Sequence, residues 1–217
     1  MAMKIRKAIF AILFLAASSV ACQSNLLSNL FTRSGDVLVA DDFSNPGSGW
    51  VTLLDQSGFM DYYNSGFRMW INIPGFNFVS TLPGDYGDVR IDVDAARIGG
   101  PDNNRFGVVC RFKDVFNYYF FLISSDGYFG IGKVVNGTTT HLGQDMMLYN
   151  PSIQKGIAPN HLQVECQGTT LTFYINGQPA GIAQDADLAS GQVGLTAGAF
   201  NDTGVDIFFD NFVVIKP

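Results

Sequence analysis

The chain has 217 residues, of which 47% are hydrophobic, and it carries 13 lysines and arginines against 19 aspartates and glutamates. This length is long for one sandwich domain and short for two domains. The formal net charge of −6 argues against nucleic acid and anionic membrane surfaces as partners, because lysine and arginine drive phosphate binding, whereas neutral sugars and cations remain compatible.

The first 22 residues have the layout of a bacterial export signal. Lys4, Arg6 and Lys7 make a positive start, an apolar run follows over 8–17, and small residues precede Cys22. The apolar run is shorter than the about 20 residues that cross a hydrocarbon core, so a retained single-span anchor is the less favoured alternative. Removing the signal leaves 13 − 3 = 10 basic residues against 19 acidic ones, a net charge of −9.

The site of signal cleavage has two interpretations. The sequence Ser-Val-Ala-Cys ending at Cys22 resembles the lipobox of bacterial lipoproteins, with Ser19 where that motif prefers leucine. Ser19 and Ala21 would equally satisfy an ordinary signal peptidase. The cysteine count favours lipidation of Cys22, because it leaves Cys110 and Cys166 as an even pair in an oxidising compartment.

A polar segment over 23–35 predicts a flexible tether, and an alternating pattern after it predicts an all-β domain over 36–217. The clearest alternation is in 161–180, which predicts a β-hairpin with an Asn-Gly turn after it. No stretch has helical periodicity, so the fold class is a two-sheet antiparallel β-sandwich. The other predicted strands are, in chain order, 36–43, 67–73, 76–82, 88–96, 105–113, 118–123, 128–135, 138–142, 191–199 and 205–215.

Several short motifs of the domain are distinctive when taken in order. They are Gly107-Val108-Val109-Cys110-Arg111, Asn117-Tyr118-Tyr119-Phe120, Asp126-Gly127-Tyr128, Asn160-His161-Leu162, Tyr174-Ile175-Asn176-Gly177 and Phe209-Asp210-Asn211-Phe212. Over about 41–217 the chain resembles the concanavalin A-like, laminin-G-like jelly-roll domains of bacterial surface proteins. These are related in fold to family 16 glycoside hydrolases and to the 3-keto-disaccharide hydrolase domain. The resemblance implies a jelly roll but no single activity, because this architecture hosts lectins, enzymes and passive modules.

Cys110 and Cys166 both fall in the apolar phase of their predicted strands. A disulfide between them would close a loop of about 55 residues and stabilise the fold by about 4 kcal/mol on the chain-entropy model. The alternative is two separate buried thiols. Export favours the disulfide, whose role is structural.

Carboxylate catalysis has little support in the sequence. Family 16 hydrolases carry a Glu-x-Asp-x-(x-)Glu strand motif, which this chain cannot form because Glu165 is its only glutamate. Asp92 and Asp94 are the nearest substitute, but they alternate with aliphatic residues beside Arg90, as on a solvated face. There is no Gly-x-Ser-x-Gly motif, and the two histidines lack the spacing of a zinc site. A glycan-cleaving hydrolase that uses aspartates stays the minority alternative.

A structural calcium ion is implied by the resemblance. Jelly rolls of this type often hold Ca²⁺ where the first and last strands meet, using aspartates and backbone carbonyls. Asp42 follows the first predicted strand and Asp210 lies on the last, and both offer the oxygen ligands that Ca²⁺ prefers. The alternative is that the two aspartates only cap strand ends or accept hydrogen bonds in turns.

Aromatic side chains in the polar phase of strands are the candidate sugar contacts. Most of the 19 phenylalanines, 8 tyrosines and 2 tryptophans belong to the core. Trp70 instead alternates with Arg68 and Asn72, Tyr174 lies between polar neighbours, and Tyr119 could join them. Aromatic platforms with polar neighbours are what pyranose binding needs, so these five residues form the predicted ligand-binding face. The alternative for each of these residues is that its side chain packs under a loop and contacts no ligand.

The sequence therefore predicts an exported, lipid-anchored, non-catalytic recognition module at the bacterial cell surface or in the periplasm, with carbohydrate as the leading ligand class. Besides the hydrolase, a structural envelope protein that associates with itself through a sheet face or edge remains an alternative. The composition predicts no nucleic-acid partner and no cofactor other than the calcium ion.

Overall fold

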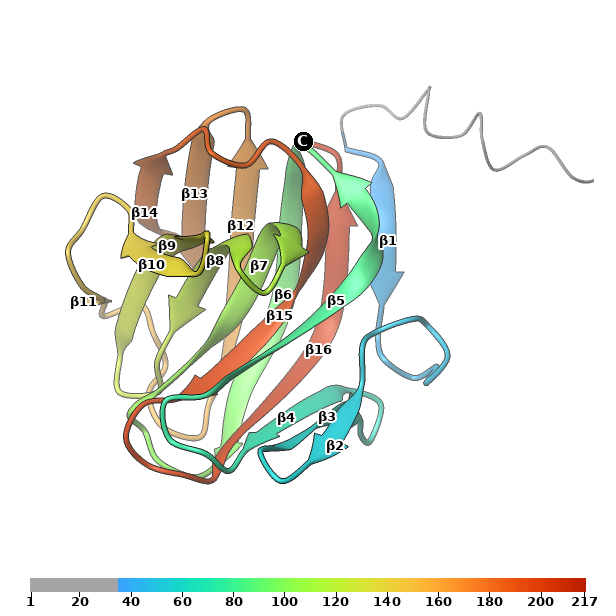
Figure 1. Cartoon of the computed structure of the whole chain (residues 1–217), viewed down its shortest axis with the longest axis vertical. Helices are drawn as coiled ribbons and strands as arrows, with labels where there is room; N and C mark the ends of the chain where they lie inside the picture. Colours follow the sequence, from blue (N-terminus) through green and yellow to red (C-terminus); the bar gives the residue numbers. More distant parts are fainter. Residues whose placement is uncertain (1–34) are drawn as a thin grey trace, which may run out of the picture. The chain divides into compact units, whose positions relative to one another are not determined.

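The computed structural model describes residues 35–217, which form two antiparallel β-sheets packed face to face (Figure 1). Over these residues the secondary structure is strands and turns, with no helix, so the prediction of an all-β sandwich is confirmed. The predicted signal, the lipidation candidate Cys22 and the tether up to residue 34 lie outside the described residues. Within 35–217 no helix has the length and apolarity needed to span a membrane.

Sheet A has nine strands. They are β1 (Val37–Asp41), β2 (Leu53–Asp55), β3 (Gly58–Tyr62), β4 (Phe67–Ile71), β6 (Val89–Gly99), β12 (Pro159–Gln167), β13 (Thr170–Ile175), β14 (Gln178–Gln184) and β16 (Val205–Ile215). Their order is β14-β13-β12-β6-β16-β4-β3-β2. The long strand β16 pairs with β4 through its first half and with β1 through its second half, so the first and last strands of the domain are neighbours.

Sheet B has seven strands. They are β5 (Asn77–Tyr86), β7 (Asn104–Asp114), β8 (Asn117–Ile123), β9 (Tyr128–Val135), β10 (Thr138–His141), β11 (Leu148–Tyr149) and β15 (Gly191–Ala199). Their order is β10-β9-β8-β7-β15-β5, and the short β11 also pairs with β9. The chain passes repeatedly from one sheet to the other, as in β5, β6 and β7, so half of the strand pairings join strands that are not consecutive in the chain.

The hairpin predicted at 161–180 is confirmed by β12 and β13, in which Cys166 pairs with Leu171 and Leu162 with Ile175. The apolar phase of both strands faces the core and is fully buried. Asn176 and Gly177 adopt positive φ angles of 52° and 75°, which the two-residue reversal into β14 requires. The alternation of apolar and polar residues therefore determines which side chains of β12 and β13 face the core.

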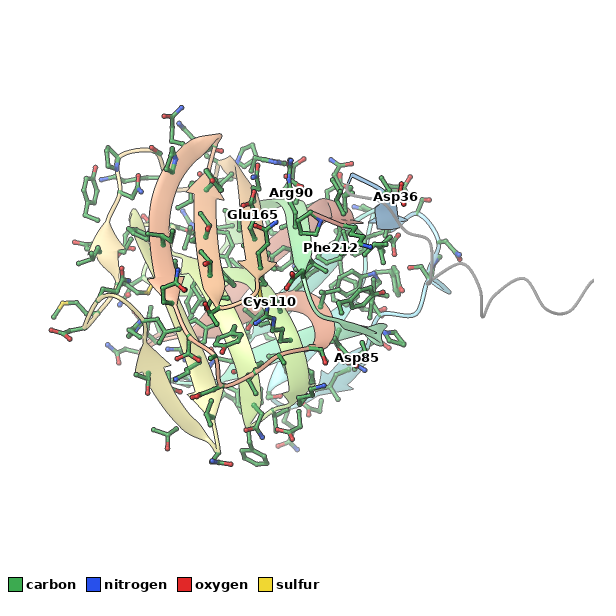
Figure 2. The ribbon with its side chains drawn as sticks, turned by 90° about the horizontal axis from the view of Figure 1, so that it is seen from above. Asp36, Asp85, Arg90, Cys110, Glu165 and Phe212 are labelled. Carbon is green, nitrogen blue, oxygen red and sulfur yellow. A yellow bond between two sulfur atoms is a disulfide. The ribbon has the colours of Figure 1, made fainter. Side chains whose placement is uncertain are left out.

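The predicted disulfide is confirmed. Cys110 on β7 and Cys166 on β12 are bonded at 2.10 Å, and both side chains are fully buried. The bond joins sheet B to sheet A across the core. Figure 2 shows Cys110 in the interior, while Arg90 and Glu165, which are paired in register on β6 and β12, lie on the outer side of sheet A.

Four short edge or near-edge strands, β2, β3, β11 and β14, were not predicted from the sequence. All three residues of β2 and both residues of β11 are exposed, so no apolar phase marks them. Strand β14 contains Pro179 and Gly181 and meets β13 across an irregular register. Edge strands of this kind carry weak patterns because only one side of them is paired.

Candidate binding site

The predicted ligand-binding face is divided by the structure. Arg68 and Trp70 on β4 and Tyr174 on β13 all point to the outer side of sheet A. The strands β12, β6 and β16 lie between β13 and β4, which at about 4.8 Å per strand separates Tyr174 from the other two by about 19 Å. Asn72 lies just past the end of β4, is exposed, and donates its backbone N–H to the Ser57 carbonyl at 2.8 Å. Only Arg68 and Trp70 are therefore brought together.

Arg68 and Trp70 are already engaged by neighbouring side chains. The Arg68 guanidinium donates two hydrogen bonds to Asp206, at 2.8 and 2.7 Å, and these raise its pKa. It also lies over the rings of Phe59 and Tyr63, 5.1 and 4.8 Å from their centroids. Trp70 stacks on Phe59 with centroids 6.0 Å apart. This arrangement favours a packing role for the cluster, which lies on an outer face but has its arginine paired with a carboxylate.

The prediction that Tyr119 joins a ligand-binding face is wrong. Its ring points into the core from β8 and has 0% exposure. The hydroxyl donates to Asp185 at 2.6 Å and accepts the Leu188 N–H at 3.1 Å, and burial together with Asp185 raises the pKa of Tyr119 to about 12. Both faces of β8 are apolar. The sequence therefore does not show which residues of this strand face the core, and alternation could not place Tyr119.

The Tyr119 hydroxyl should matter for stability and for its pH dependence. Burial raises the pKa of Asp185, but hydrogen bonds from Lys133 and Tyr119 outweigh it and hold that pKa below its usual value. A lowered carboxyl pKa stabilises the fold above the unfolded-state pKa, and this stability disappears as the pH falls through the folded-state pKa. We expect Tyr119→Phe to cost about 1–3 kcal/mol at pH 7, because the Leu188 N–H loses its partner. The variant should also lose less stability between pH 7 and pH 3 than the wild type does, because the pKa of Asp185 is then lowered less.

Urea denaturation at pH 7 and pH 3 measures both effects of Tyr119→Phe. The matched control is Tyr128→Phe, because the Tyr128 ring is 41% exposed. That variant should keep wild-type stability at both pH values. Equal stability of the two variants would contradict a structural role for the Tyr119 hydroxyl.

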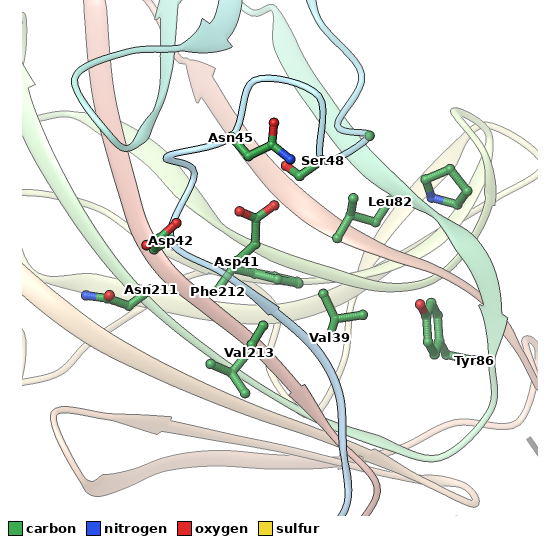
Figure 3. A pocket seen from close by; sticks show the side chains of 13 residues that line it. Val39, Asp41, Asp42, Asn45, Ser48, Leu82, Tyr86, Asn211, Phe212 and Val213 are labelled. Carbon is green, nitrogen blue, oxygen red and sulfur yellow. The ribbon is translucent and has the colours of Figure 1, made fainter. Parts of the chain in front are cut away.

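The two predicted calcium ligands line two different cavities. Asp42 lies at the rim of a cavity of about 780 Å³ between β1, β5 and β16, and its pKa is lowered by hydrogen bonds from Ser44 (Figure 3). Asp210 lines a different cavity, and the neighbouring Asn211 side chain turns away from Asp42 to donate to Asp94 at 2.9 Å. Within 35–217 no group of three or more His, Cys, Asp or Glu side chains is arranged to hold a metal. Calcium binding by Asp42 and Asp210 stays a prediction.

Asp92 and Asp94, the aspartates of the hydrolase alternative, are both held by His161 on the outer side of sheet A. The His161 ring nitrogens lie 2.8 Å from Asp94 and 3.3 Å from Asp92. Asp92 also accepts two hydrogen bonds from Arg90, at 2.8 and 2.9 Å. The two carboxyls project side by side from one strand, whereas a glycosidase needs carboxyls on both sides of the scissile bond. The geometry favours an ion-pair network on the sheet surface.

The outer side of sheet B contains a groove of about 410 Å³, here called the sheet B groove. Glycines occupy the outward positions beside β8, next to the base of this groove. Leu122 is paired with Gly107 on β7 and Gly130 on β9, and Phe120 is paired with Gly132 on β9. A Cβ on Gly132 would come within 2.2 Å of the Phe120 ring, so a side chain there would displace the ring. The glycine therefore lets the Phe120 ring lie over the neighbouring strand at the base of the groove.

The base of the sheet B groove is aromatic and aliphatic. Tyr118, Phe120 and Leu122 point outward from β8 and pack with Val109 and Val134 in an apolar cluster separate from the main core. They retain 9%, 5% and 9% exposure at the bottom of the groove. An apolar base of this kind is suited to the apolar face of a sugar ring.

Polar side chains stand at the two ends of the groove. At one end Arg105 on β7 donates to the Asn77 side chain at 2.5 Å and lies over the Phe200 ring at 4.5 Å. At the other end Thr139 and His141 come from β10, and the His141 ring packs edge-on against the groove base. No Asp or Glu is among the described residues that line the groove.

The sequence prediction missed this groove, although two signals were present. The run Tyr118–Ile123 is apolar without interruption, which is typical of a strand covered on both faces. Glycines recur in the outward phase of the neighbouring strands at Gly107, Gly130 and Gly132, and glycine inside a strand pattern often marks a close approach.

Comparison with known proteins identifies the fold. No protein-family model and no curated protein matches the chain. Among solved structures, the carbohydrate binding module CBM66 from Bacillus subtilis superposes with a TM-score of 0.63 at 19% identity, over 77% of this chain and 96% of the module. The β-glucanase of Bacillus licheniformis gives 0.59 at 12% identity, over 85% of this chain and 100% of the enzyme. The GH43 protein BlXynB from Bacillus licheniformis gives 0.62 at 16% identity over 82% of this chain, which spans 39% of that protein. The predicted jelly-roll fold is confirmed.

Proposed function

We propose that this protein is a non-catalytic recognition module that binds carbohydrate in the sheet B groove. The observation that carries the proposal is a groove with an aromatic base and polar ends that has no carboxylate among its described lining residues. Its volume of about 410 Å³ lies within the range of small-molecule sites. Glycoside cleavage needs two carboxyls beside the scissile bond, so this lining supports binding rather than hydrolysis.

The similarity to a carbohydrate binding module supports the same assignment, whereas the similarity to a β-glucanase means that the fold alone does not choose between binding and cleavage. The lining of the groove supports binding. The disulfide supports export, because such bonds persist in oxidising compartments. Together with the signal-like start and Cys22, it supports a lipid-anchored protein of the bacterial envelope.

The test compares one variant in the groove with one on the previously predicted face. Phe120→Leu keeps an apolar side chain but removes the ring from the groove base, and Trp70→Ala removes the largest aromatic of the outer side of sheet A. Binding of a panel of oligosaccharides to the full-length protein is measured by calorimetry. We expect Phe120→Leu to weaken binding about tenfold, equivalent to about 1.4 kcal/mol, and Trp70→Ala to leave it unchanged.

Two results would contradict the proposed function. Loss of binding in Trp70→Ala with full binding in Phe120→Leu would place the site on sheet A. Release of reducing sugar from a bound glycan, abolished by Asp92→Asn or Asp94→Asn, would favour the hydrolase instead.

A further inference from the structure

We propose that the sheet B groove selects acidic sugars and that Arg105 pairs with the carboxylate of a uronate residue. This inference rests on the proposed function, because it specifies which class of sugar the groove takes. Two features of the groove support it: an arginine with no acidic partner, and an apolar base next to it.

Arg105 differs from every other arginine of residues 35–217. The other four are each paired with a carboxylate: Arg68 with Asp206, Arg90 with Asp92, Arg97 with Asp102 and Arg111 with Asp88. Arg105 instead donates to neutral oxygens, the Asn77 side chain at 2.5 Å and the Gly75 carbonyl at 3.4 Å. In a chain with 19 acidic and 13 basic residues, an arginine without a carboxylate partner is conspicuous.

The surroundings of Arg105 increase its need for an anion. Its guanidinium lies over the Phe200 ring at 4.5 Å and lines the groove. Burial lowers the pKa of Arg105, whereas the aspartate partners of Arg68 and Arg90 raise theirs. A partly dehydrated cation without a counter-ion is costly, and a carboxylate would offset that cost. The planar guanidinium can also hold a carboxylate through two parallel hydrogen bonds.

His141 lines the groove and contributes an aromatic edge beside its base. Burial lowers the pKa of the His141 ring. Its Nδ1 is hidden from solvent and is therefore not available to a ligand in the groove.

The combination selects one ligand chemistry. The base formed by Tyr118, Phe120 and Leu122 requires an apolar surface on the ligand, and Arg105 requires an anionic group within the same small volume. A uronate has a pyranose ring with an apolar face and a carboxylate attached to it. The acidic residues elsewhere on the protein do not oppose this pairing over distance, because physiological salt screens charges beyond about 8 Å.

The test uses the full-length protein and three pairs of oligosaccharides: galacturonate, alginate and glucuronoxylan fragments, each beside its carboxyl-reduced form. Calorimetry should show at least one uronate oligomer bound about tenfold more tightly than its reduced form. Arg105→Gln should abolish this preference, and Arg105→Lys should restore part of it. Lys155→Gln is the matched control, because it removes a positive charge that lies over the Tyr149 ring, outside the groove.

Each outcome bears on the inference. Equal affinity for uronate and reduced forms, unchanged in Arg105→Gln, would overturn it while leaving the proposed function intact. Preference for a sulfated galactan oligomer over every uronate would overturn the uronate assignment. Absence of binding to all sugars would refute the proposed function as well. If Arg105→Gln does not fold, Asn77→Ala provides the second test, because Asn77 is exposed and orients the guanidinium, and it should reduce the uronate preference alone.

Discussion

Replacing Cys110 and Cys166 together by alanine is expected to lower the free energy of unfolding by about 4 kcal/mol. The two cysteines are 56 residues apart and their bond joins the two sheets, so its loss frees a long loop in the unfolded chain and unlinks the sheets in the folded one. Urea denaturation at pH 7 of the wild type and the double variant measures the difference. The free energy of unfolding of an ordinary domain is only about 5–15 kcal/mol. A loss of this size therefore strongly increases the fraction of unfolded protein.

A reducing agent provides the control for the disulfide. Dithiothreitol should bring the wild type down towards the stability of the double variant and should leave the variant itself unchanged. A double variant that loses less than about 1 kcal/mol would show that the bond contributes little to the fold.

Phe173→Ala is expected to cost about 3–5 kcal/mol, because a large ring is removed from a fully packed interior. Phe173 lies on β13 of sheet A with 0% exposure, and its ring contacts Phe121 and Phe129 on sheet B, with centroids 5.7 and 6.3 Å away. The matched control is Phe116→Ala, whose ring is 60% exposed and should change stability by less than about 0.5 kcal/mol. Thermal and urea unfolding compare the two, and equal losses would mean that the cavity at Phe173 closes by rearrangement.

The sandwich and its disulfide could be predicted because the relevant strands have one apolar and one polar face. In β6, Val89, Ile91 and Val93 are buried, while Arg90 and Asp94 project outward between them. This alternation fixes which side of the strand faces the core, and it places both cysteines there as well.

The sheet B groove could not be predicted in the same way. On β8 both phases are apolar, so Tyr118 and Tyr119 are indistinguishable in sequence, although one lines the groove and the other is buried in the core. The hollow also depends on which glycines lie opposite which aromatics. That register between strands is set by pairing across the whole sheet and is not local information.

The role of the predicted face on sheet A depended on contacts that are distant in sequence. Alternation correctly placed Arg68 and Trp70 on an outer side. The carboxylate that pairs with Arg68 belongs to Asp206, 138 residues away, and the ring that stacks on Trp70 belongs to Phe59 on the next strand. A polar-phase aromatic was therefore an indication of orientation but not of an open binding surface.

The place where a sugar contacts this jelly roll can be observed directly by recording amide chemical shifts of isotopically labelled protein during titration with a bound oligosaccharide. We expect the largest changes at Arg105, Thr139 and His141 and along β8, around the sheet B groove. Changes confined to the surroundings of Trp70 or Tyr174 on sheet A would contradict this expectation.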